Sequence, residues 1–379
     1  MSKKKIIIVI DASRNRSGGA INYLKNFIKH LNFKKKNIKI ILFSHQHILD
    51  QISNKSFLIK KNHPFLEKNI FFQIIWQLII LPIYLKKNGI NILYSTDSST
   101  FCNYSNSIVF NQDILSFDKE AVNQIPFSLK KIRLYIIKFL QIRSMNKAKE
   151  VIFLSKYSKK IISKYLNKNK NYNIIPHGID ENLKKIGKFN KSNSSKNYEL
   201  KNIIRLVYVS PLFLYKNHIT VVKSFLSLKK KYKNLDIKFI GDYTKNLDIY
   251  NKLLSLSPII NKNNFTGDLA HKDVIKNLVN SDVFIFASSS ETFGISLLEA
   301  MVIGMPIICS NKSSLPEILQ NGGLYFNPKN DLELANKIEK LIQNKNLRKK
   351  KSFRAREIAN NYSWDKNVKQ FNKIINKLI

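Results

Sequence analysis

Short apolar runs alternate with longer helix-like segments over most of this chain, and this alternation restricts the possible folds. Strand-length runs in the first half lie at residues 6–10, 38–43, 92–95, 108–110, 151–154 and 173–175. Those in the second half lie at 205–209, 236–240, 264–266, 283–287, 306–309 and 324–326. Helical segments fall between them, at 20–31, 127–146, 219–231 and 272–279, and most of 332–379 is helical. The pattern predicts an α/β fold with parallel sheets covered by helices.

A chain of 379 residues is too long for one core and suits two domains of about 150–200 residues. A stretch rich in Lys, Asn and Ser interrupts the alternation between residues 184 and 202. We predict a first domain over 1–185, a linker over 186–202 and a second domain over 203–360. A C-terminal helix over 361–379 is expected to pack back on the first domain. Two doubly wound, Rossmann-like domains facing a central cleft follow from this division, because ligands bind outside the carboxyl ends of such strands.

Neither apolar segment near the first domain's start predicts a membrane span or a signal peptide. Ile6–Ile10 is only five residues long and Asp11 follows it, so a first strand is expected. Residues 70–85 are shorter than the roughly 20 apolar residues that a span needs. They also contain Gln73, Gln77 and Pro82, so we expect a buried or interfacial helix there. The two cysteines, Cys102 and Cys309, have no metal-ligand spacing and are expected to be buried thiols.

The net charge of +40 raises the question of an anionic partner. Nucleic acid, an anionic membrane surface and anionic substrates are the candidates. The basic residues are spread over both halves, within a general enrichment in Lys, Asn and Ile, and no nucleic-acid recognition motif is visible. A compositional bias with mild attraction to an anionic membrane is therefore favoured over a nucleic-acid partner. Segment 127–146 places Ile132, Ile136, Phe139 and Ile142 on one stripe of a helix that is expected to rest on lipid.

Two carboxylates separated by seven residues, Glu291 and Glu299, form the most informative motif of the chain. Glu291 lies in a loop of small residues after an apolar run, and Glu299 lies in the helix expected over 296–301. A strand, a glycine-containing loop and a helix N-terminus form an anion site, because unpaired N–H groups and the helix dipole point outward. The motif therefore suggests a nucleotide-sugar site, with phosphates at the helix N-terminus and hydroxyls on the carboxylates.

Three further loops carry candidate ligand-binding residues. Gly18 and Gly19 follow the first strand, where glycine lets the backbone approach a ligand, although the loop lacks the GxGxxG dinucleotide pattern. Lys216 follows the first strand of the second domain, where an ammonium group neutralises a diphosphate. Gly267 and Leu269 follow a strand and are expected to contact a flat base. His271, just beyond them, is expected to be a surface residue at a helix start.

These loops together resemble the retaining GT-B glycosyltransferases of family 4, and the resemblance spans nearly the whole chain. Glu291 to Glu299 matches that family's E-x7-E motif, Ser210–Asn217 its phosphate-lysine loop and Gly18–Gly19 its N-terminal glycine loop. Segments 153–158 and 175–180 match the end of the family's first domain. Residues 110–117 look like the bacterial branch that builds O-antigens and other surface polysaccharides.

The resemblance implies a role for each candidate residue. Glu291 contacts the hydroxyls of the donor sugar, Glu299 holds the ribose, and Lys216 binds the diphosphate. Backbone N–H groups at Phe293, Gly294 and Ile295 assist Lys216, and Gly18 and Gly19 approach the donor phosphates and the acceptor. The implied reaction retains the anomeric configuration and uses neither a metal ion nor a cofactor; no Asp-x-Asp motif is evident.

The chain departs from the family pattern at two positions. Ser210 stands where many members have an arginine, and Asn111 stands where many have a sugar-contacting histidine. We therefore expect Glu291, Lys216 and Asn111 as catalytic residues, and Ser210 as a donor-binding residue without the usual charge.

The resulting expectation is a cytoplasmic glycosyltransferase, peripheral at the inner face of the plasma membrane. It would transfer a hexose-type sugar from a nucleotide-sugar to a glycan or lipid-linked oligosaccharide during the synthesis of O-antigen, lipopolysaccharide or capsule. Three alternatives remain open: a nucleotide-sugar epimerase of the same fold, a non-catalytic glycosyltransferase-like subunit, and a basic nucleic-acid-binding module.

Overall fold

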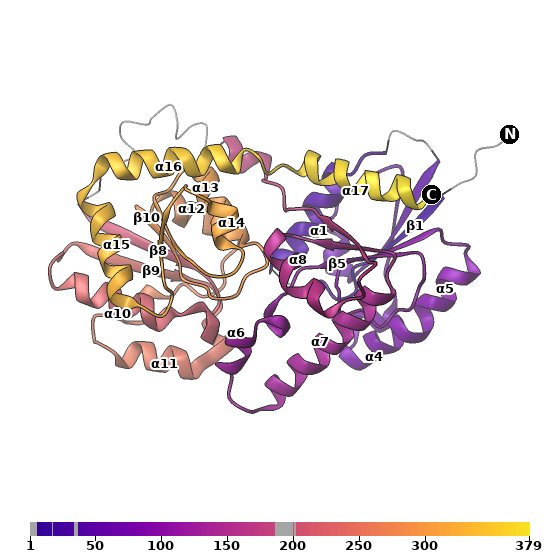
Figure 1. Cartoon of the computed structure of the whole chain (residues 1–379), viewed down its shortest axis with the longest axis horizontal. Helices are drawn as coiled ribbons and strands as arrows, with labels where there is room; N and C mark the ends of the chain where they lie inside the picture. Colours follow the sequence, from indigo (N-terminus) through magenta and orange to yellow (C-terminus); the bar gives the residue numbers. More distant parts are fainter. Residues whose placement is uncertain (1–5, 17, 34–36, 186–199, 201) are drawn as a thin grey trace. The chain divides into compact units, whose positions relative to one another are not determined.

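The computed structural model describes residues 6–16, 18–33, 37–185, 200 and 202–379, which divide into two compact units (Figure 1). Unit 1 comprises Met1–Phe117, Pro126–Gly178 and Ser363–Ile379, and unit 2 comprises Asp118–Ile125 and Ile179–Tyr362. All but two residues of the linker predicted over 186–202 lie outside the described residues. Each unit is an α/β domain built on a parallel sheet, so the predicted fold class is confirmed.

Unit 1 contains a seven-stranded parallel sheet in the order β3-β2-β1-β4-β5-β6-β7. Its central strands are rich in Ile, Val, Leu and Phe, as expected for strands covered by helices on both faces. The strands are β1 (Ile6–Asp11), β2 (Ile38–Phe43), β3 (Leu58–Lys61), β4 (Ile92–Ser95), β5 (Ser107–Asn111), β6 (Glu150–Phe153) and β7 (Asn171–Ile174).

The helices of unit 1 connect these strands, and one of them comes from the C-terminal end of the chain. They are α1 (Gly18–His30), α2 (Gln46–Leu49), α3 (Pro64–Glu67), α4 (Ile70–Ile75), the π-helix η1 (Trp76–Ile80), α5 (Leu81–Lys87), η2 (Leu115–Phe117), α7 (Leu129–Lys147), α8 (Lys156–Ile162), η3 (Ser163–Tyr165) and α17 (Trp364–Leu378).

Unit 2 contains a five-stranded parallel sheet in the order β12-β11-β10-β8-β9. Its strands are β8 (Ile204–Val209), β9 (Leu235–Ile240), β10 (Val283–Phe286), β11 (Ile307–Ser310) and β12 (Leu324–Phe326). Its helices are α6 (Lys119–Asn123), η4 (Leu214–Lys216), α10 (His218–Lys229), η5 (Tyr243–Asn246), α11 (Leu247–Ser255), η6 (Lys262–Asn264), α12 (His271–Val279), α13 (Ile295–Ile303), α14 (Leu315–Leu319), α15 (Asp331–Gln343) and α16 (Lys345–Ala359).

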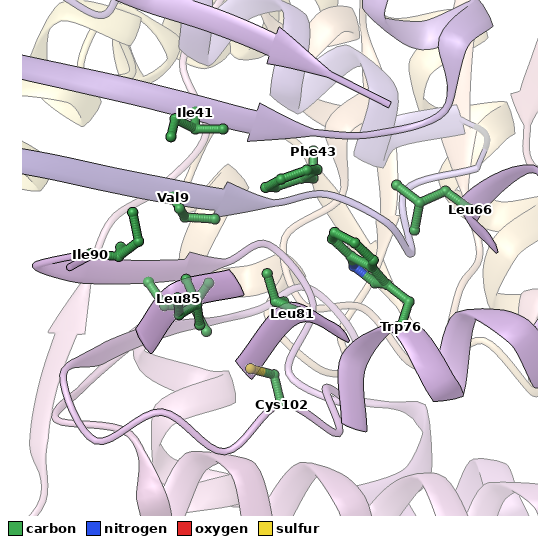
Figure 2. Close-up of a cluster of buried hydrophobic side chains, with 10 residues drawn as sticks. Val9, Ile41, Phe43, Leu66, Trp76, Leu81, Leu85, Ile90 and Cys102 are labelled. Atoms are coloured by element: carbon green, nitrogen blue, oxygen red, sulfur yellow. The ribbon is translucent and has the colours of Figure 1, made fainter. Parts of the chain in front are cut away.

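The α4–η1–α5 helix packs on the unit 1 sheet through a compact apolar cluster (Figure 2). Trp76, Leu81 and Leu85 of the helix contact Val9 and Phe43 of the sheet. Cys102 belongs to the same cluster, and both cysteines are buried, as predicted. This packing fixes the helix against the sheet and leaves its other side outward.

The outward side of the α4–η1–α5 helix is apolar, whereas part of its inner side is polar. Gln73 and Gln77 are 0% and 1% exposed, while Phe71, Ile79 and Ile83 are 62%, 53% and 59% exposed. Gln77 Nε2 donates to Asp11 Oδ2 at 2.9 Å, and Phe101 N donates to Gln77 Oε1 at 3.2 Å. The helix thus differs from a usual surface helix, because it buries two glutamines beside its apolar core residues and exposes an apolar outer side.

By length and composition, Ile70–Lys87 is the one helix within the described residues that is able to cross a membrane, with 28% of it buried. A second apolar surface lies on α7, where three of the four residues of the predicted stripe face outward and the fourth, Ile142, packs against the core of the unit. Ile132, Ile136 and Phe139 are 40%, 54% and 66% exposed, and α7 packs instead through Gln141, Ser144 and Met145.

Helix α17 belongs to unit 1 although it ends the chain. Phe371 packs edge-on against Phe27 of α1 at 4.9 Å between ring centroids, and Asn367 Nδ2 donates to Pro176 O at 2.7 Å. Trp364 is 4% exposed and lies against Gly178. A Cβ atom on Gly178 would lie 2.2 Å from Trp364 N, so only glycine permits this approach.

Two segments differ from the sequence prediction. Leu58–Lys61, which has only two apolar residues, is the edge strand β3 that periodicity missed. The strand predicted over 264–266 forms only isolated bridges, Phe239 with Phe265 and Gly241 with Gly267. There, Asn264 Nδ2 donates to Ile237 O at 2.9 Å and takes the place of a backbone partner.

Candidate active site

The sheet of unit 2 has a topological switch point between β8 and β10. The chain passes from β8 to β9 on one side of the sheet and returns to β10 on the other. Helices that leave neighbouring strands in opposite directions open a crevice at the carboxyl ends of those strands. Lys216 follows β8 and Glu291 follows β10, so the fold brings both residues to this crevice.

Lys216 Nζ and Glu291 Oε1 form an ion pair, and both side chains are largely enclosed, with 12% and 15% of their area exposed. The loops that hold them are fixed through the backbone. Tyr208 Oη donates to Lys216 O at 2.6 Å, and Ser314 Oγ donates to Glu291 O at 3.0 Å. The ammonium group has three donors, of which Glu291 uses one. The pair is therefore a pre-positioned cation beside a carboxylate that can accept hydrogen bonds.

Two helix N-termini without a side-chain cap flank this pair. Helices α11, α15 and α16 are each capped by an asparagine side chain. Helices α10 and α13 are preceded by the left-handed residues Asn217 (φ 54°) and Gly294 (φ 87°). Neither residue makes a side-chain hydrogen bond that caps its helix. Asn217 Nδ2 donates instead to Ala287 O at 2.8 Å and Ser289 Oγ at 2.7 Å, which ties the two loops together. Uncapped N–H groups and the helix dipoles favour an anion here.

The predicted residues Phe293, Gly294 and Ile295 lie at the start of α13. Phe293 is 1% exposed, and its ring packs against Tyr362 at 5.5 Å between centroids. A Cβ atom on Gly294 would lie 3.1 Å from Phe286 Cε1, in a backbone conformation that other residues rarely adopt. Ile295 is the first residue of the helix. The glycine is thus required for the turn that aims this helix N-terminus.

Glu299 pairs with His271, a contact that the sequence analysis did not foresee. His271 Nε2 lies 2.7 Å from Glu299 Oε1, with side-chain exposures of 41% and 12%. His271 starts α12 immediately after the loop of Gly267 and Leu269. The pair therefore places Glu299 beside the loop that was expected to contact the base.

Ser210 and Gly267 both lie beside Gly241, which follows the end of β9. Ser210 N donates to Ile240 O at 2.7 Å, and Gly241 N donates to Gly267 O at 2.9 Å. A Cβ atom on Gly241 would lie 2.4 Å from Ser210 O, so this contact also requires glycine. Leu269 is half-buried further along the loop. Tyr243, whose ring lies 3.5 Å from a Cβ built on Gly267, is a further aromatic neighbour that no sequence signal identified.

His218 contributes no positive charge to the site at neutral pH. Its ring is 2% exposed and stacks on Tyr208 at 4.6 Å between centroids. Burial, together with the Lys216 charge, lowers the pKa of His218 to about 3. Lys216 therefore supplies the positive charge of the two loops that follow β8 and β10. The described residues include no group of three or more His, Cys, Asp or Glu side chains suited to a metal ion.

The predicted residues Gly18, Gly19 and Asn111 belong to unit 1. Gly18 and Gly19 are exposed at the start of α1, just after β1, and Gly18 has a φ of 59°. Asn111 is fully buried at the end of β5. Its Nδ2 donates to Ser98 Oγ at 3.0 Å and to Asp113 O at 2.9 Å. Asn111 thus links the loop after β4, which contains Ser98, to the loop after β5, which contains Asp113.

Comparison with known proteins shows similarity to glycosyltransferases in sequence and in fold. The sequence profile described as "Glycosyl transferases group 1" matches residues 188–358. An uncharacterized glycosyltransferase of Methanocaldococcus jannaschii is 30% identical over 238 residues, which cover 62% of this chain and 59% of that protein. The chain thus matches less than two thirds of the length of this relative.

Two solved structures share the whole fold. HepE of Anabaena, solved with UDP and glucose, superposes with a TM-score of 0.70 at 18% identity, covering 98% of this chain and 100% of HepE. WaaG, a glycosyltransferase involved in lipopolysaccharide biosynthesis, superposes with a TM-score of 0.71 at 14% identity, covering 98% and 99% of the two chains. The protein has the GT-B fold of two Rossmann-like domains, and its second half is related to the group 1 glycosyltransferases.

Proposed function

We propose that this protein is a glycosyltransferase that moves a hexose-type sugar from a nucleotide-sugar to a glycan or lipid-linked acceptor in surface-polysaccharide synthesis. The observation that carries the proposal is the enclosed Lys216–Glu291 pair at the unit 2 switch point, between two uncapped helix N-termini. The group 1 profile supports the class of enzyme. The UDP bound to HepE supports a nucleotide-sugar donor, and the role of WaaG supports a lipopolysaccharide-type product.

In the proposed reaction, the diphosphate of the donor lies on the N-termini of α10 and α13, with Lys216 as counter-ion. The bond between the anomeric carbon and the diphosphate oxygen breaks, and negative charge develops on that oxygen. The acceptor hydroxyl attacks from the same face and passes its proton to the departing phosphate, so the configuration is retained. Glu291 orients the sugar through its hydroxyls, and Glu299 holds the ribose. The proposal assigns no step to a metal ion.

The test is donor turnover by the purified wild-type protein and by Glu291→Gln. We expect the variant to lose about 10- to 100-fold in kcat/KM, because a hydrogen bond to a charged group contributes about 1.5–3 kcal/mol. Glu357→Gln removes a carboxylate from an exposed ion pair on α16 and serves as the matched control. Absence of turnover with every nucleotide-sugar tried, or an unimpaired Glu291→Gln, would rule the proposal out.

We also propose that the protein acts at the cytoplasmic face of the plasma membrane as a peripheral protein. The outward residues Phe71, Ile79 and Ile83 support this location, together with the exposed Lys86 and Lys87 at the end of the same helix. Apolar side chains enter the headgroup boundary, and lysines are attracted to anionic lipid. The inner glutamines anchor this helix to the domain, which favours lying on the bilayer over crossing it.

Replacing Phe71, Ile79 and Ile83 together by serine is expected to weaken binding to vesicles of phosphatidylcholine and phosphatidylglycerol by at least about tenfold. Each side chain is more than half exposed, so stability is expected to change little. Sedimentation with vesicles measures the binding. Leu332→Ser changes a comparably exposed residue of unit 2 and is the control. Equal binding by the triple variant and the control would contradict the proposed membrane surface.

A further inference from the structure

A histidine from a neighbouring helix holds the second carboxylate of the E-x7-E motif. His271 Nε2 lies 2.7 Å from Glu299 Oε1. A carboxylate only accepts hydrogen bonds, so the imidazole donates, either as a neutral ring protonated at Nε2 or as an imidazolium. Among the described residues, His271 is the one side chain that hydrogen-bonds to Glu299. The orientation of this carboxylate therefore depends on a single partner.

Helix α13 offers Glu299 no charged partner of its own. Its sequence is Ile-Ser-Leu-Leu-Glu-Ala-Met-Val-Ile, in which Glu299 is the only charged residue. Leu298 and Ala300 on either side are 3% and 0% exposed, and the Glu299 side chain is 12% exposed. Enclosing a carboxylate in this way is unfavourable unless a donor from another element compensates it. His271 is that donor.

The position of α12 explains why His271 reaches Glu299. Helix α12 contacts α13, and its residues Ile275 and Leu278 are 7% and 0% exposed. This packing fixes the first residue of α12, His271, beside α13. The imidazole side chain is 41% exposed and directly follows the loop of Gly267 and Leu269. The histidine thus joins that loop to the carboxylate of the motif.

Most of the accepting capacity of Glu299 is left for a ligand. A carboxylate has two oxygens with about four lone-pair positions. His271 uses Oε1, and Oε2 forms no hydrogen bond with any described residue. Two neighbouring hydroxyls, as in ribose, present two donors side by side to such a carboxylate. A glutamate that is already fixed loses little rotamer freedom when a ligand binds, which favours binding.

We propose that His271 is a positioning residue for the nucleotide part of the donor. It holds Glu299 in the rotamer in which the carboxylate accepts from the ribose hydroxyls, so the nucleotide binds without ordering this side chain. His271 acts through Glu299 and takes no part in the transfer of the sugar. The inference rests on the proposed function in naming the ligand as a nucleotide.

The test measures binding of UDP, GDP and ADP to the full-length protein by calorimetry, followed by the dideoxy form of the one that binds most tightly. We expect His271→Ala to weaken binding of the ribonucleotide about tenfold, because Glu299 must then be ordered on binding. The dideoxy form offers Glu299 no ribose hydroxyl, so its binding should change less than about twofold. His271→Gln keeps an N–H donor of similar reach and should stay within about threefold of wild type.

Two control variants separate positioning from general damage, and thermal unfolding checks that each variant is folded. Lys272→Ala changes the neighbouring exposed residue of α12 and should alter binding less than about threefold. In a Glu299→Ala background, His271→Ala should have no further effect, because no carboxylate is left to orient. Steady-state kinetics with a turned-over nucleotide-sugar should show a higher KM and an unchanged kcat for His271→Ala.

Three outcomes would overturn the assignment. Equal losses for the ribonucleotide and its dideoxy form would mean that His271 does not act on ribose recognition. Tighter binding by His271→Ala would mean that the histidine competes with the nucleotide for Glu299. A full effect of His271→Ala in the Glu299→Ala background would mean that it acts by another route.

Failure of this inference is distinguishable from failure of the proposed function. A protein that turns over a nucleotide-sugar but shows any of these three outcomes refutes only the role of His271. Binding with the expected ribose dependence but without turnover refutes only the proposed function. If the wild-type protein binds none of the three diphosphates, both the proposed donor and the role of His271 are refuted.

Discussion

Replacing Lys216 by alanine is expected to lower kcat for sugar transfer by about 10²- to 10³-fold, the range seen when one group stabilising transition-state charge is removed. The Lys216 side chain is 12% exposed and its ammonium group pairs with Glu291, so neither water nor a mobile side chain replaces it readily. Its loss also leaves the carboxylate of Glu291, whose side chain is 15% exposed, without its ion-pair partner. Both effects reduce stabilisation of the departing diphosphate.

Steady-state kinetics with a turned-over nucleotide-sugar measure this effect. Lys223→Ala, at an exposed position of the same helix α10, is the matched control and should keep wild-type rates. Lys216→Ala combined with Glu291→Gln should lose less than the product of the two single effects, because residues in contact are coupled. A Lys216→Ala variant within threefold of wild type would show that the cation has no part in the reaction.

Gly178→Ala is expected to destabilise unit 1 by about 1–3 kcal/mol, the usual cost of overpacking. The added methyl would lie 2.2 Å from the backbone nitrogen of Trp364 and 2.5 Å from its Cγ. A backbone clash at the start of α17 is not relieved by a rotamer change. The helix must shift, and contacts such as Phe371 with Phe27 and Asn367 with Pro176 weaken with it.

Thermal unfolding and the fluorescence of the two tryptophans follow this change. For a unit of this size each kcal/mol corresponds to a fall in Tm of about 2–4 °C. Trp364, 4% exposed in the wild type, should become more accessible to a quencher. Lys369→Ala, on the exposed side of α17, is the control and should alter stability by less than about 0.5 kcal/mol. An unchanged Tm and quenching would contradict the packing described here.

Both carboxylates of the Glu291–Glu299 motif are paired within the protein itself. Glu291 meets Lys216, and Glu299 meets His271. A nearly enclosed carboxylate is costly without a partner, so each pair offsets the burial of its carboxylate. A nucleotide-sugar would replace or share these partners, which makes Lys216 and His271 the residues most sensitive to a bound donor.

Much of the fold was predictable because buried parallel strands have a strong sequence signal. The apolar run at β2 predicted its bounds without error, and the helices α10 and α12 were predicted to within one or two residues. The edge strand β3 was missed because Leu58–Lys61 has only two apolar residues. A strand was predicted over 264–266, but the segment forms only isolated bridges, and the side chain of Asn264 supplies one of its hydrogen bonds to β9.

The candidate site was predictable where the strand order determines it. Lys216 and Glu291 are 75 residues apart, but each follows a central strand of one parallel sheet, so their meeting follows from the topology. The pairing of Glu299 with His271 had no such signal, because an exposed histidine at a helix start looks like any surface residue.

The sequence by itself determined the alternation of strands and helices, the two-domain α/β fold and the loops that carry Glu291, Glu299 and Lys216, because these depend on local periodicity and spacing. Only the tertiary structure decided which side of each helix faces the core. The α4–η1–α5 helix turns its glutamines inward, because Asp11, Ser13 and the Phe101 backbone offer hydrogen bonds there, and so leaves Phe71 and Ile83 outside. That choice depends on partners from distant parts of the chain, which no local pattern contains.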